Sequence, residues 1–397
     1  MSVVERQATT SQKPPYPDFP EDEYKLRWGR ARSLMARADL DALFITEPKN
    51  YMYFTGHRSD QITGDKIRPF IILMLANGEP ICFGPPFELG HVRLTTWIQN
   101  VRTYQLLHHN EVIAETLREV GLGKARIGAE LGREQYLGMN LLDFRALEAL
   151  LPDAKFVDAA DVLLSLRVIK SPLELERLRR ANSITSEAIA EAFDHVKAGM
   201  STIDVARLVR IGMMQRGADN VAAMMIAAGH DFTNGKVSVP TPRPLEVGDT
   251  LTVDCSASVK GYYSDIARTS VIGKATEEQK AMYRMVIELN HRCYEELRPG
   301  NVCEDVNLRC QRELQKLGRQ TQAVGRIGHG VGCDPAEYPS LAVGEKLPLE
   351  PGMVFACNPN FTTDFGFFNV EENLVVTESG PEMLVDPEGP AELRVLG

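Results

Sequence analysis

The sequence predicts an α+β protein in which an α/β domain is followed by a larger domain of mixed helices and strands. The chain has 397 residues, which suits two domains of about 100–200 residues each. Strand-like runs alternate with helix-like runs over residues 21–168, as in an α/β domain. Over residues 169–397 the helices and the strands group separately, which is typical of an α+β domain.

The first domain is preceded by a segment without periodic apolar residues. Residues 1–20 are rich in Ser, Thr, Gln and Pro, and we interpret them as an extended arm. A helix is predicted over Tyr24–Ala38 and a buried strand over Ala42–Thr46, which Glu47-Pro48 ends. Further strands are predicted in RPFIILML and ARIGAE, and further helices over 110–120 and 138–150.

A helix start marks the beginning of the second domain. Ser171 suits the N-cap, Pro172 the first helical position and Glu174 the third, which makes a capping box. Gly199 is expected to end this long helix. Helices over 202–216, 276–297 and 302–318 are predicted to follow, with a strand-rich section over 221–273 and strands to the C-terminus.

The composition limits the partners and the cellular compartment. Forty-four Lys and Arg against 54 Asp and Glu give a net charge of −10, and no basic cluster suggests a nucleic-acid or membrane surface. No apolar run approaches the about 20 residues of a membrane span. Seven cysteines without a C-x-x-C pair fit a reducing, cytoplasmic setting. We therefore expect a small-molecule partner or a second copy of the chain, with no nucleic acid and no membrane.

One segment, TLTVDCSASVKGYYSDIARTSV, has the pattern of a β-hairpin. Lys260-Gly261 makes a plausible two-residue turn between two extended runs. If Val259 pairs with Tyr262, the register of the whole hairpin follows from the turn.

This register brings two acids to one face of the hairpin. Asp254 would lie opposite Ala267, with Asp265 diagonally next to it and the two carboxylates within roughly 7–8 Å. Two anions that close on a buried face need a cation, a shared proton or water. On a solvated face they would need none of these, and the segment alone leaves that alternative open.

Two later segments hold further candidate groups. His329 lies between Gly328 and Gly330, and flanking glycines allow close backbone approach to an unhindered imidazole, although a loop histidine without a function fits the same pattern. Glu371 and Glu372 fall in an apolar, strand-like run, where alternation would send one side chain inward and the other outward.

Taken together, these motifs resemble the pita-bread metallopeptidase family, which includes methionine aminopeptidase, Xaa-Pro aminopeptidase, prolidase and the related creatinase. The likeness is carried by VDCSASVKGYYSDIARTSV, GHG, PGMVF and VEENLVVTE, in this order. LRVIKSPLELERLRRAN and DALFITEPKNYMYFTG are similar to the two-domain creatinase and prolidase version. The resemblance implies an N-terminal creatinase-like α/β domain followed by a C-terminal pita-bread domain, in a homodimer.

The resemblance also implies a metal centre, with one replacement. Asp254, Asp265, His329 and Glu371 match four of the five metal ligands of the family. The fifth, a glutamate in a Glu-Pro pair, falls at Asn358, whose neutral amide oxygen is a weaker ligand. We expect one divalent ion (Mn, Zn, Co or Fe), or none, rather than two. A metal-free pocket of these acids would suit a cationic substrate, with one carboxylate as proton donor or base.

Other replacements concern the catalytic groups that the family implies. The second family histidine falls at Ala336, which leaves Glu337 beside it, and a substrate-contacting histidine would fall at Val237. His230 lies seven residues too early for that role. We take His329, Glu337 and Glu371 as candidate catalytic residues, and Arg58, His230 and Asn358 as candidate substrate contacts. In creatinase-like relatives the loop that would contain Arg58 reaches the active site of the dimer partner, and the alternative for this loop is a solvated charged surface.

The cysteines next to the motifs are not expected to be nucleophiles. If Asp254 and Asn358 face the pocket, strand alternation turns Cys255 and Cys357 away from it. Cys333 lies in a loop, with no obvious base.

The sequence thus predicts a creatinase- or Xaa-Pro-peptidase-like hydrolase that cleaves a C–N bond in a small amino-acid-like, dipeptide or guanidino-type compound. One alternative is a metal-dependent Xaa-Pro dipeptidase, or a lyase on the same fold. The other is a binding protein that retains the fold without catalysis.

Overall fold

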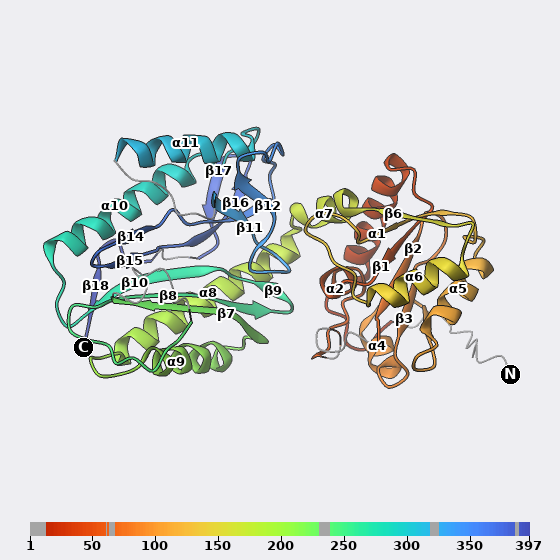
Figure 1. Cartoon of the computed structure of the whole chain (residues 1–397), viewed down its shortest axis with the longest axis horizontal. Helices are drawn as coiled ribbons and strands as arrows, with labels where there is room; N and C mark the ends of the chain where they lie inside the picture. The colour runs from red at the N-terminus through yellow and green to blue at the C-terminus, as the bar shows by residue number, and fades with distance from the viewer. Residues whose placement is uncertain (1–12, 61, 63–67, 230–238, 318–324, 386–388) are drawn as a thin grey trace. The chain divides into compact units, whose positions relative to one another are not determined.

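The chain folds into two compact units, Met1–Arg167 and Val168–Gly397. The computed structural model in Figure 1 describes residues 13–60, 62, 68–229, 239–317, 325–385 and 389–397.

The first unit is built on a six-stranded mixed sheet with the order β4-β3-β2-β1-β5-β6. Strands β1, β2 and β3 pair antiparallel, whereas the other neighbours pair parallel. The strands are β1 (Ala42–Ile45), β2 (Ile71–Leu75), β3 (Ile81–Gly84), β4 (Asn100–Thr103), β5 (Arg126–Ala129) and β6 (Lys155–Asp158).

Helices alternate with most of these strands, as the sequence predicts. Phe44, Leu73 and Ile127 of the sheet form one buried cluster with Ile113 and Leu147 of two covering helices. The helices of this unit are α1 (Glu21–Arg37), α2 (Pro48–Thr55), α4 (Leu89–Thr95), α5 (His109–Glu119), α6 (Leu141–Leu150) and α7 (Ala160–Val168).

Helix α2 lies where no helix is expected from the sequence. Pro48 takes the first helical position, and the Glu47 carboxylate accepts the Asn50 backbone N–H at 3.0 Å. The Glu47-Pro48 pair, which ends the strand, therefore also starts a helix.

The end of the predicted arm packs on this unit as well. The Phe19 side chain is buried, and its ring stacks edge-on against Tyr24 of α1.

The second unit has two five-stranded sheets between two layers of helices (Figure 1), and β14 (Phe361–Thr363) and β15 (Gly366–Phe368) form a separate two-stranded sheet. One sheet has the order β18-β10-β8-β7 with β9 paired to β8, and the other has the order β12-β11-β13-β16-β17. Helices α8 (Pro172–His195) and α9 (Thr202–Gln215) cover the first sheet, and α10 (Glu277–Tyr294) and α11 (Cys303–Lys316) cover the second.

The strands of this unit carry the candidate site. They are β7 (Asn220–Ala228), β8 (Thr250–Val259), β9 (Tyr262–Tyr263), β10 (Ile266–Ile272), β11 (Arg326–Gly330), β12 (Glu337–Ala342), β13 (Val354–Cys357), β14 (Phe361–Thr363), β15 (Gly366–Phe368), β16 (Glu372–Thr377), β17 (Gly380–Met383) and β18 (Arg394–Leu396).

The capping box that opens α8 is confirmed. Ser171 Oγ accepts the Glu174 N–H at 3.2 Å, and the Glu174 carboxylate accepts the Ser171 N–H at 2.8 Å. The predicted end of this helix at Gly199 is wrong. The helix ends at His195, and Gly199, with φ of +88°, belongs to the turn that leads into α9.

The predicted hairpin and its register are confirmed. Lys260 and Gly261 have φ values of +54° and +77°, which a tight turn between twisted strands requires. Val259 pairs with Tyr262, and Asp254 lies opposite Ala267.

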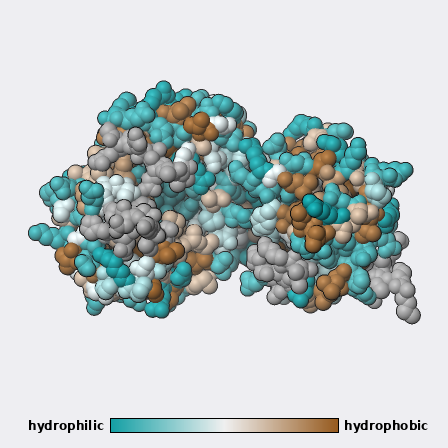
Figure 2. Space-filling view, in the orientation of Figure 1, coloured by the Kyte–Doolittle hydropathy of each residue, from teal (hydrophilic) through white to brown (hydrophobic). Residues whose placement is uncertain are grey.

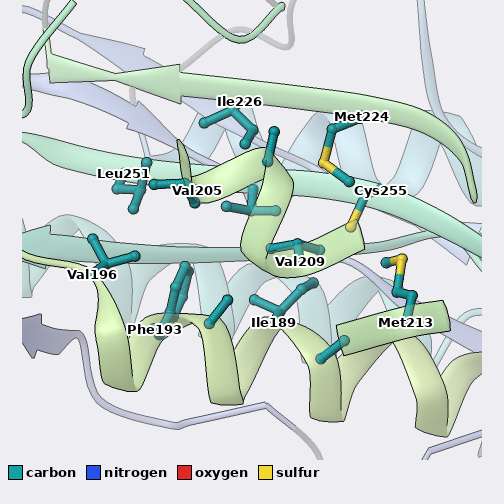
Figure 3. Packing of buried hydrophobic residues seen from close by; sticks show 14 of the residues in the cluster. Ile189, Phe193, Val196, Val205, Val209, Met213, Met224, Ile226, Leu251 and Cys255 are labelled. Carbon is teal, nitrogen blue, oxygen red and sulfur yellow. The ribbon is translucent and has the colours of Figure 1, made fainter. Parts of the chain in front are cut away.

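A buried apolar cluster joins α8 and α9 to the first sheet (Figure 3). Ile189 and Phe193 of α8 and Val209 of α9 point toward Ile226 and Leu251 of the sheet. This cluster fixes the strand that carries Asp254 against a rigid layer.

Hydrophilic residues cover most of the described surface in the view of Figure 2. Among the helices described, none has both the length and the apolar character that crossing a membrane requires.

We predict that Ile189→Ala lowers the free energy of unfolding by about 2–4 kcal/mol, because it leaves a cavity in the buried cluster. Ile211→Ala on α9 is the matched control, since that isoleucine is 54% exposed, and it should change stability by less than about 0.5 kcal/mol. Urea denaturation followed by circular dichroism measures both. Equal losses for the two variants would contradict this assignment of the core.

Candidate active site

The candidate site lies where the two sheets of the second unit meet. An antiparallel bridge joins Ala267 of β10 to Glu371, which directly precedes β16, with N···O distances of 3.4 and 3.1 Å. The Asn373 side chain accepts the Asp265 N–H and donates to the Asp265 carbonyl, both at 2.8 Å. These contacts hold Asp265 and Glu371 side by side, although more than 100 positions separate them in the sequence.

The imidazole of His329 on β11 completes a group of three. Its Nδ1 donates to the Gly330 carbonyl at 3.1 Å, so Nε2 carries the lone pair. Nε2 lies 3.5 Å from Asp265 Oδ2 and 3.9 Å from Glu371 Oε1. The ligand atoms of the three residues all lie within 4.8 Å of one another.

The glycines beside His329 are required by the neighbouring strands. A Cβ atom at Gly328 would lie 2.3 Å from the Ala356 carbonyl oxygen, and one at Gly330 would lie 2.6 Å from the Tyr338 carbonyl oxygen. The predicted close backbone approach is therefore confirmed, and it lets β11 place the imidazole between β12 and β13.

Asp254 lies next to this group on the same hairpin. Its Oδ2 accepts a hydrogen bond from Asn369 Nδ2 at 3.3 Å, while Asp265 Oδ1 accepts one from Ser256 at 3.4 Å. Asp254 raises the pKa of Asp265, which indicates that the two carboxylates are close, as the hairpin predicts.

The acids of the site are held in an environment that disfavours their charge. Burial raises the pKa of Asp254 to about 7. Burial first, and then the charges of the neighbouring acids, raise the pKa values of Asp265 and Glu371 well above their usual range. Burial also lowers the pKa of His329 to about 4, which keeps the imidazole neutral. A cation bound next to the neutral imidazole would favour the charged form of these acids and so lower their pKa values again.

One buried oxygen of the group formed by Asp265, His329 and Glu371 has no hydrogen-bond partner in the described part of the chain. Glu371 Oε1 is buried and makes no hydrogen bond with the described residues. Such an oxygen is costly unless water or a cation meets it. Two carboxylates and a neutral imidazole are a donor set that suits Zn, Mn, Co or Fe(II). The geometry thus fits one divalent ion bound by Asp265, His329 and Glu371.

Asn358 follows β13 and lies beside the group. Its side chain and that of Asn369 hydrogen-bond to Glu371, which partly offsets the rise in the pKa of that carboxyl. At this position the structure supplies an amide and no fourth carboxylate.

Glu337 is paired with a lysine that the sequence analysis did not single out. Lys170 Nζ lies 2.9 Å from Glu337 Oε1, and both side chains are almost fully buried. Lys170 sits directly before the cap of α8, and no local pattern indicates a partner so far along the chain. The neighbouring Ala336, where the family histidine would fall, is exposed.

Both adjacent glutamates are buried, so neither reaches solvent, and they have different partners: Glu371 groups with Asp265 and His329, whereas Glu372 does not. Glu372 forms an ion pair with Arg268 at 2.8 Å. The same guanidinium donates to the Glu371 carbonyl at 3.0 Å. Glu372 therefore contributes to the site indirectly, because it neutralises the arginine that holds the Glu371 backbone.

A second cation near the group was also missed. Arg326 begins β11 and donates to Ser340 at 3.1 Å. Its charge partly offsets the rise in the pKa of Asp265 and adds to the effect of burial that lowers the pKa of His329.

Arg58 belongs to the first unit, where it donates to both carboxylate oxygens of Asp18 at 2.9 and 3.3 Å. His230 and Val237 lie outside the described residues.

The cysteines lie as alternation predicts. Cys255 belongs to the apolar cluster of α8 and α9, and Cys357 hydrogen-bonds with Cys293 of α10. Cys333 is buried.

Comparison with known proteins agrees with this architecture. Residues 27–169 match the creatinase/prolidase N-terminal domain, and residues 176–378 match metallopeptidase family M24. These matches confirm the predicted fold class, a creatinase-like α/β domain followed by a pita-bread domain.

Individual relatives extend over nearly the whole chain. A Xaa-Pro dipeptidase of Pyrococcus furiosus is 25% identical over 366 residues, which cover 92% of this chain and 99% of that protein. An uncharacterized peptidase of Bacillus subtilis, YqhT, is 27% identical over 372 residues, with 92% and 99% covered.

Solved structures show the same fold. The dipeptidase PepE of Mycobacterium ulcerans has a TM-score of 0.82 at 25% identity, with 95% of this chain and 99% of that chain covered. A prolidase of Thermococcus sibiricus has a TM-score of 0.83 at 21% identity, with 94% and 99% covered. The chain therefore belongs to metallopeptidase family M24, as a two-domain hydrolase of the creatinase and Xaa-Pro peptidase type.

Proposed function

We propose that this chain is a one-metal hydrolase that cleaves a C–N bond in a small amino-acid-like compound, with Xaa-Pro dipeptides as the first substrates to test. The observation that carries the proposal is the convergence of Asp265, His329 and Glu371, with an unpartnered buried oxygen on Glu371. The relatives named Xaa-Pro dipeptidase support the substrate class.

In this proposal Asp265, His329 and Glu371 hold the ion, and Asp254 is the adjacent fourth ligand. A bound divalent ion would polarise the scissile carbonyl group and lower the pKa of a water molecule. The protein supplies the fixed positions: the Gly330 carbonyl orients His329, and Asn373 orients Asp265.

A second ion is disfavoured by charge. Three carboxylates of the site can neutralise one divalent ion but not two, and Asn358 adds no charge. One ion leaves Asn358 available as a hydrogen-bonding group for substrate, the role predicted for it.

The remaining predicted groups keep distinct roles in the proposal. Glu337 serves as the proton acceptor, with its carboxylate held by Lys170 Nζ. Arg58 and His230 stay predicted substrate contacts. The homodimer and the cytoplasmic location stay predictions as well.

A guanidino-type or other cationic compound is the second candidate substrate. It is favoured by the acids of the site, whose raised pKa values allow one of them to donate a proton near neutral pH. A lyase or a non-catalytic binding protein on this fold would also use such a pocket, and the substrate tests below separate these possibilities.

We predict that the purified chain binds a divalent transition metal and hydrolyses Xaa-Pro dipeptides or guanidino compounds, and that Asp265→Ala abolishes both. The variant loses one of the four proposed ligands and one of the three negative charges that neutralise the ion. The matched control is Asp249→Asn, because Asp249 is also buried but already pairs with Arg243 at 2.8 Å. Metal analysis and detection of the released amine measure the two properties.

Equal metal content in the Asp265→Ala and Asp249→Asn variants would contradict the metal assignment. If neither substrate class is hydrolysed while one raises the melting temperature, the chain is a binding protein. Elimination products in place of hydrolysis products would identify a lyase.

Restoring the missing carboxylate should increase metal binding. We predict that Asn358→Glu binds a second equivalent of Mn²⁺ or Co²⁺, because it adds a fourth acid beside Glu371. Asn358→Gln is the control, since it lengthens the side chain by the same amount without charge. Titration calorimetry gives the stoichiometry, and an unchanged value for Asn358→Glu would argue against this explanation of the single ion.

Metal binding should strengthen with pH. The pKa of Asp254 is raised to about 7, so below this pH the ion must displace protons, and affinity should rise by about tenfold per pH unit for each proton released. Without metal, the folded chain binds these protons more tightly than the unfolded chain, so its stability should fall as the pH rises through about 7. The Asp254→Asn variant should show a shallower slope in both measurements, and an identical slope would refute the role of Asp254.

A further inference from the structure

A second group of ligand-type side chains lies in the first unit, apart from the acids described above. His57 follows the end of α2, while Glu88 and His91 lie at the start of α4. One ligand atom from each lies within 4.8 Å of the others. The sequence motifs and the proposed function assign no role to these three residues.

The ring of His57 is fixed with its lone pair toward this group. The side chain is fully buried, and Nδ1 lies 3.0 Å from Thr95 Oγ1. The Thr95 hydroxyl lies 3.2 Å from the His91 and Val92 carbonyls, so its proton goes to one of them. The hydroxyl oxygen therefore accepts from Nδ1–H, and Nε2 carries the lone pair. Nε2 is buried and has no hydrogen-bond partner among the described residues.

Glu88 provides a second buried atom that has no hydrogen-bond partner among the described residues and lies near His57 Nε2. Its Oε1 accepts a hydrogen bond from Ser59 at 3.3 Å, whereas Oε2 is buried and makes none with the described residues. Oε2 lies 3.5 Å from His57 Nε2 and 3.4 Å from His91 Nδ1. Ligand atoms about 2.1 Å from a tetrahedral zinc ion lie about 3.4 Å from one another, so both distances match that geometry.

A protonated histidine is a poor explanation of this contact. Burial, followed by the charges of His91 and Arg58, lowers the pKa of His57 to about 3. In the tautomer that Thr95 selects, the Nε2 lone pair faces a carboxylate oxygen at 3.5 Å, which is repulsive without a cation between them. The Arg58 guanidinium donates to both carboxylate oxygens of Asp18.

We propose that His57 Nε2, Glu88 Oε2 and His91 Nδ1 form a second metal site, which takes Zn²⁺ or a similar transition metal ion. Thr95 acts as the positioning residue that selects the tautomer of His57. The His91 side chain is half exposed, which leaves a path for the ion and for a water ligand. The ion would tie the segment after α2, which includes Arg58, to α4.

The test is titration of the full chain with Zn²⁺ in an Asp265→Ala background, which removes the site between the sheets. We expect one equivalent of zinc, and a tetrahedral absorption spectrum when Co²⁺ replaces it. His91→Ala should weaken zinc binding by about tenfold or more, since even second-shell changes cost about tenfold. His108→Ala is the matched control: His108 is also exposed and pairs with an acid three residues on, Glu111 at 3.8 Å, but the described part of the chain gives this pair no third ligand.

Two outcomes would overturn the proposal: no zinc bound by the Asp265→Ala protein, or equal affinities in the His91→Ala and His108→Ala variants. His91 is half exposed, so its variant should fold, and circular dichroism checks this. If the Asp265→Ala background does not fold, the wild-type protein replaces it, and His91→Ala should then lose one equivalent of zinc relative to His108→Ala. Because no readout is activity, failure of this site and failure of the proposed hydrolase function are distinguishable.

Discussion

Repulsion among three carboxylates, two of them buried and that of Asp254 partly buried, is the constraint on which the second unit depends. Asp254, Asp265 and Glu371 are brought together from two sheets. Burial raises the pKa of each, and the charges of the neighbouring acids raise the pKa values of Asp265 and Glu371 further. The surrounding structure opposes this repulsion with rigid backbone contacts. The bridge between Ala267 and Glu371 joins the sheets at that point, and the packed layer of α8 and α9 holds β8 in place. The fold thus keeps like charges close so that a cation can stabilise them.

Two basic residues behind the site are each paired with another acid, so they do not neutralise the three carboxylates. Arg268 is paired with Glu372 and donates to the Glu371 carbonyl, so it fixes the backbone while its charge is already compensated. Lys170 is likewise compensated by Glu337. Buried ion pairs contribute little net stability, but they define which geometry is allowed. These two basic residues therefore leave the three carboxylates of the site unneutralised, because each is paired with another acid.

The sequence predicts the parts of the site that depend on local geometry. The register of the hairpin follows from Lys260-Gly261, and with it the common face of Asp254 and Asp265. The capping box of α8 is local in the same sense. The pairing of Lys170 with Glu337, which spans 167 positions, has no periodic or turn signal. The group of His57, Glu88 and His91 was missed for the same reason, since two of its residues lie on an element far along the chain from the first.

Where this chain departs from the family pattern, its site becomes less negative and loses an imidazole. Asn358 removes one negative charge relative to the family pattern, and Ala336 is exposed and contributes no imidazole. With three carboxylates and a neutral His329, one divalent ion would leave the site with a single negative charge, whereas two ions would leave it positive. A buried charge of this size is stabilised by one opposite charge on the ligand. A substrate with one protonated amine or one guanidinium supplies it, which is why both candidate substrate classes share that feature.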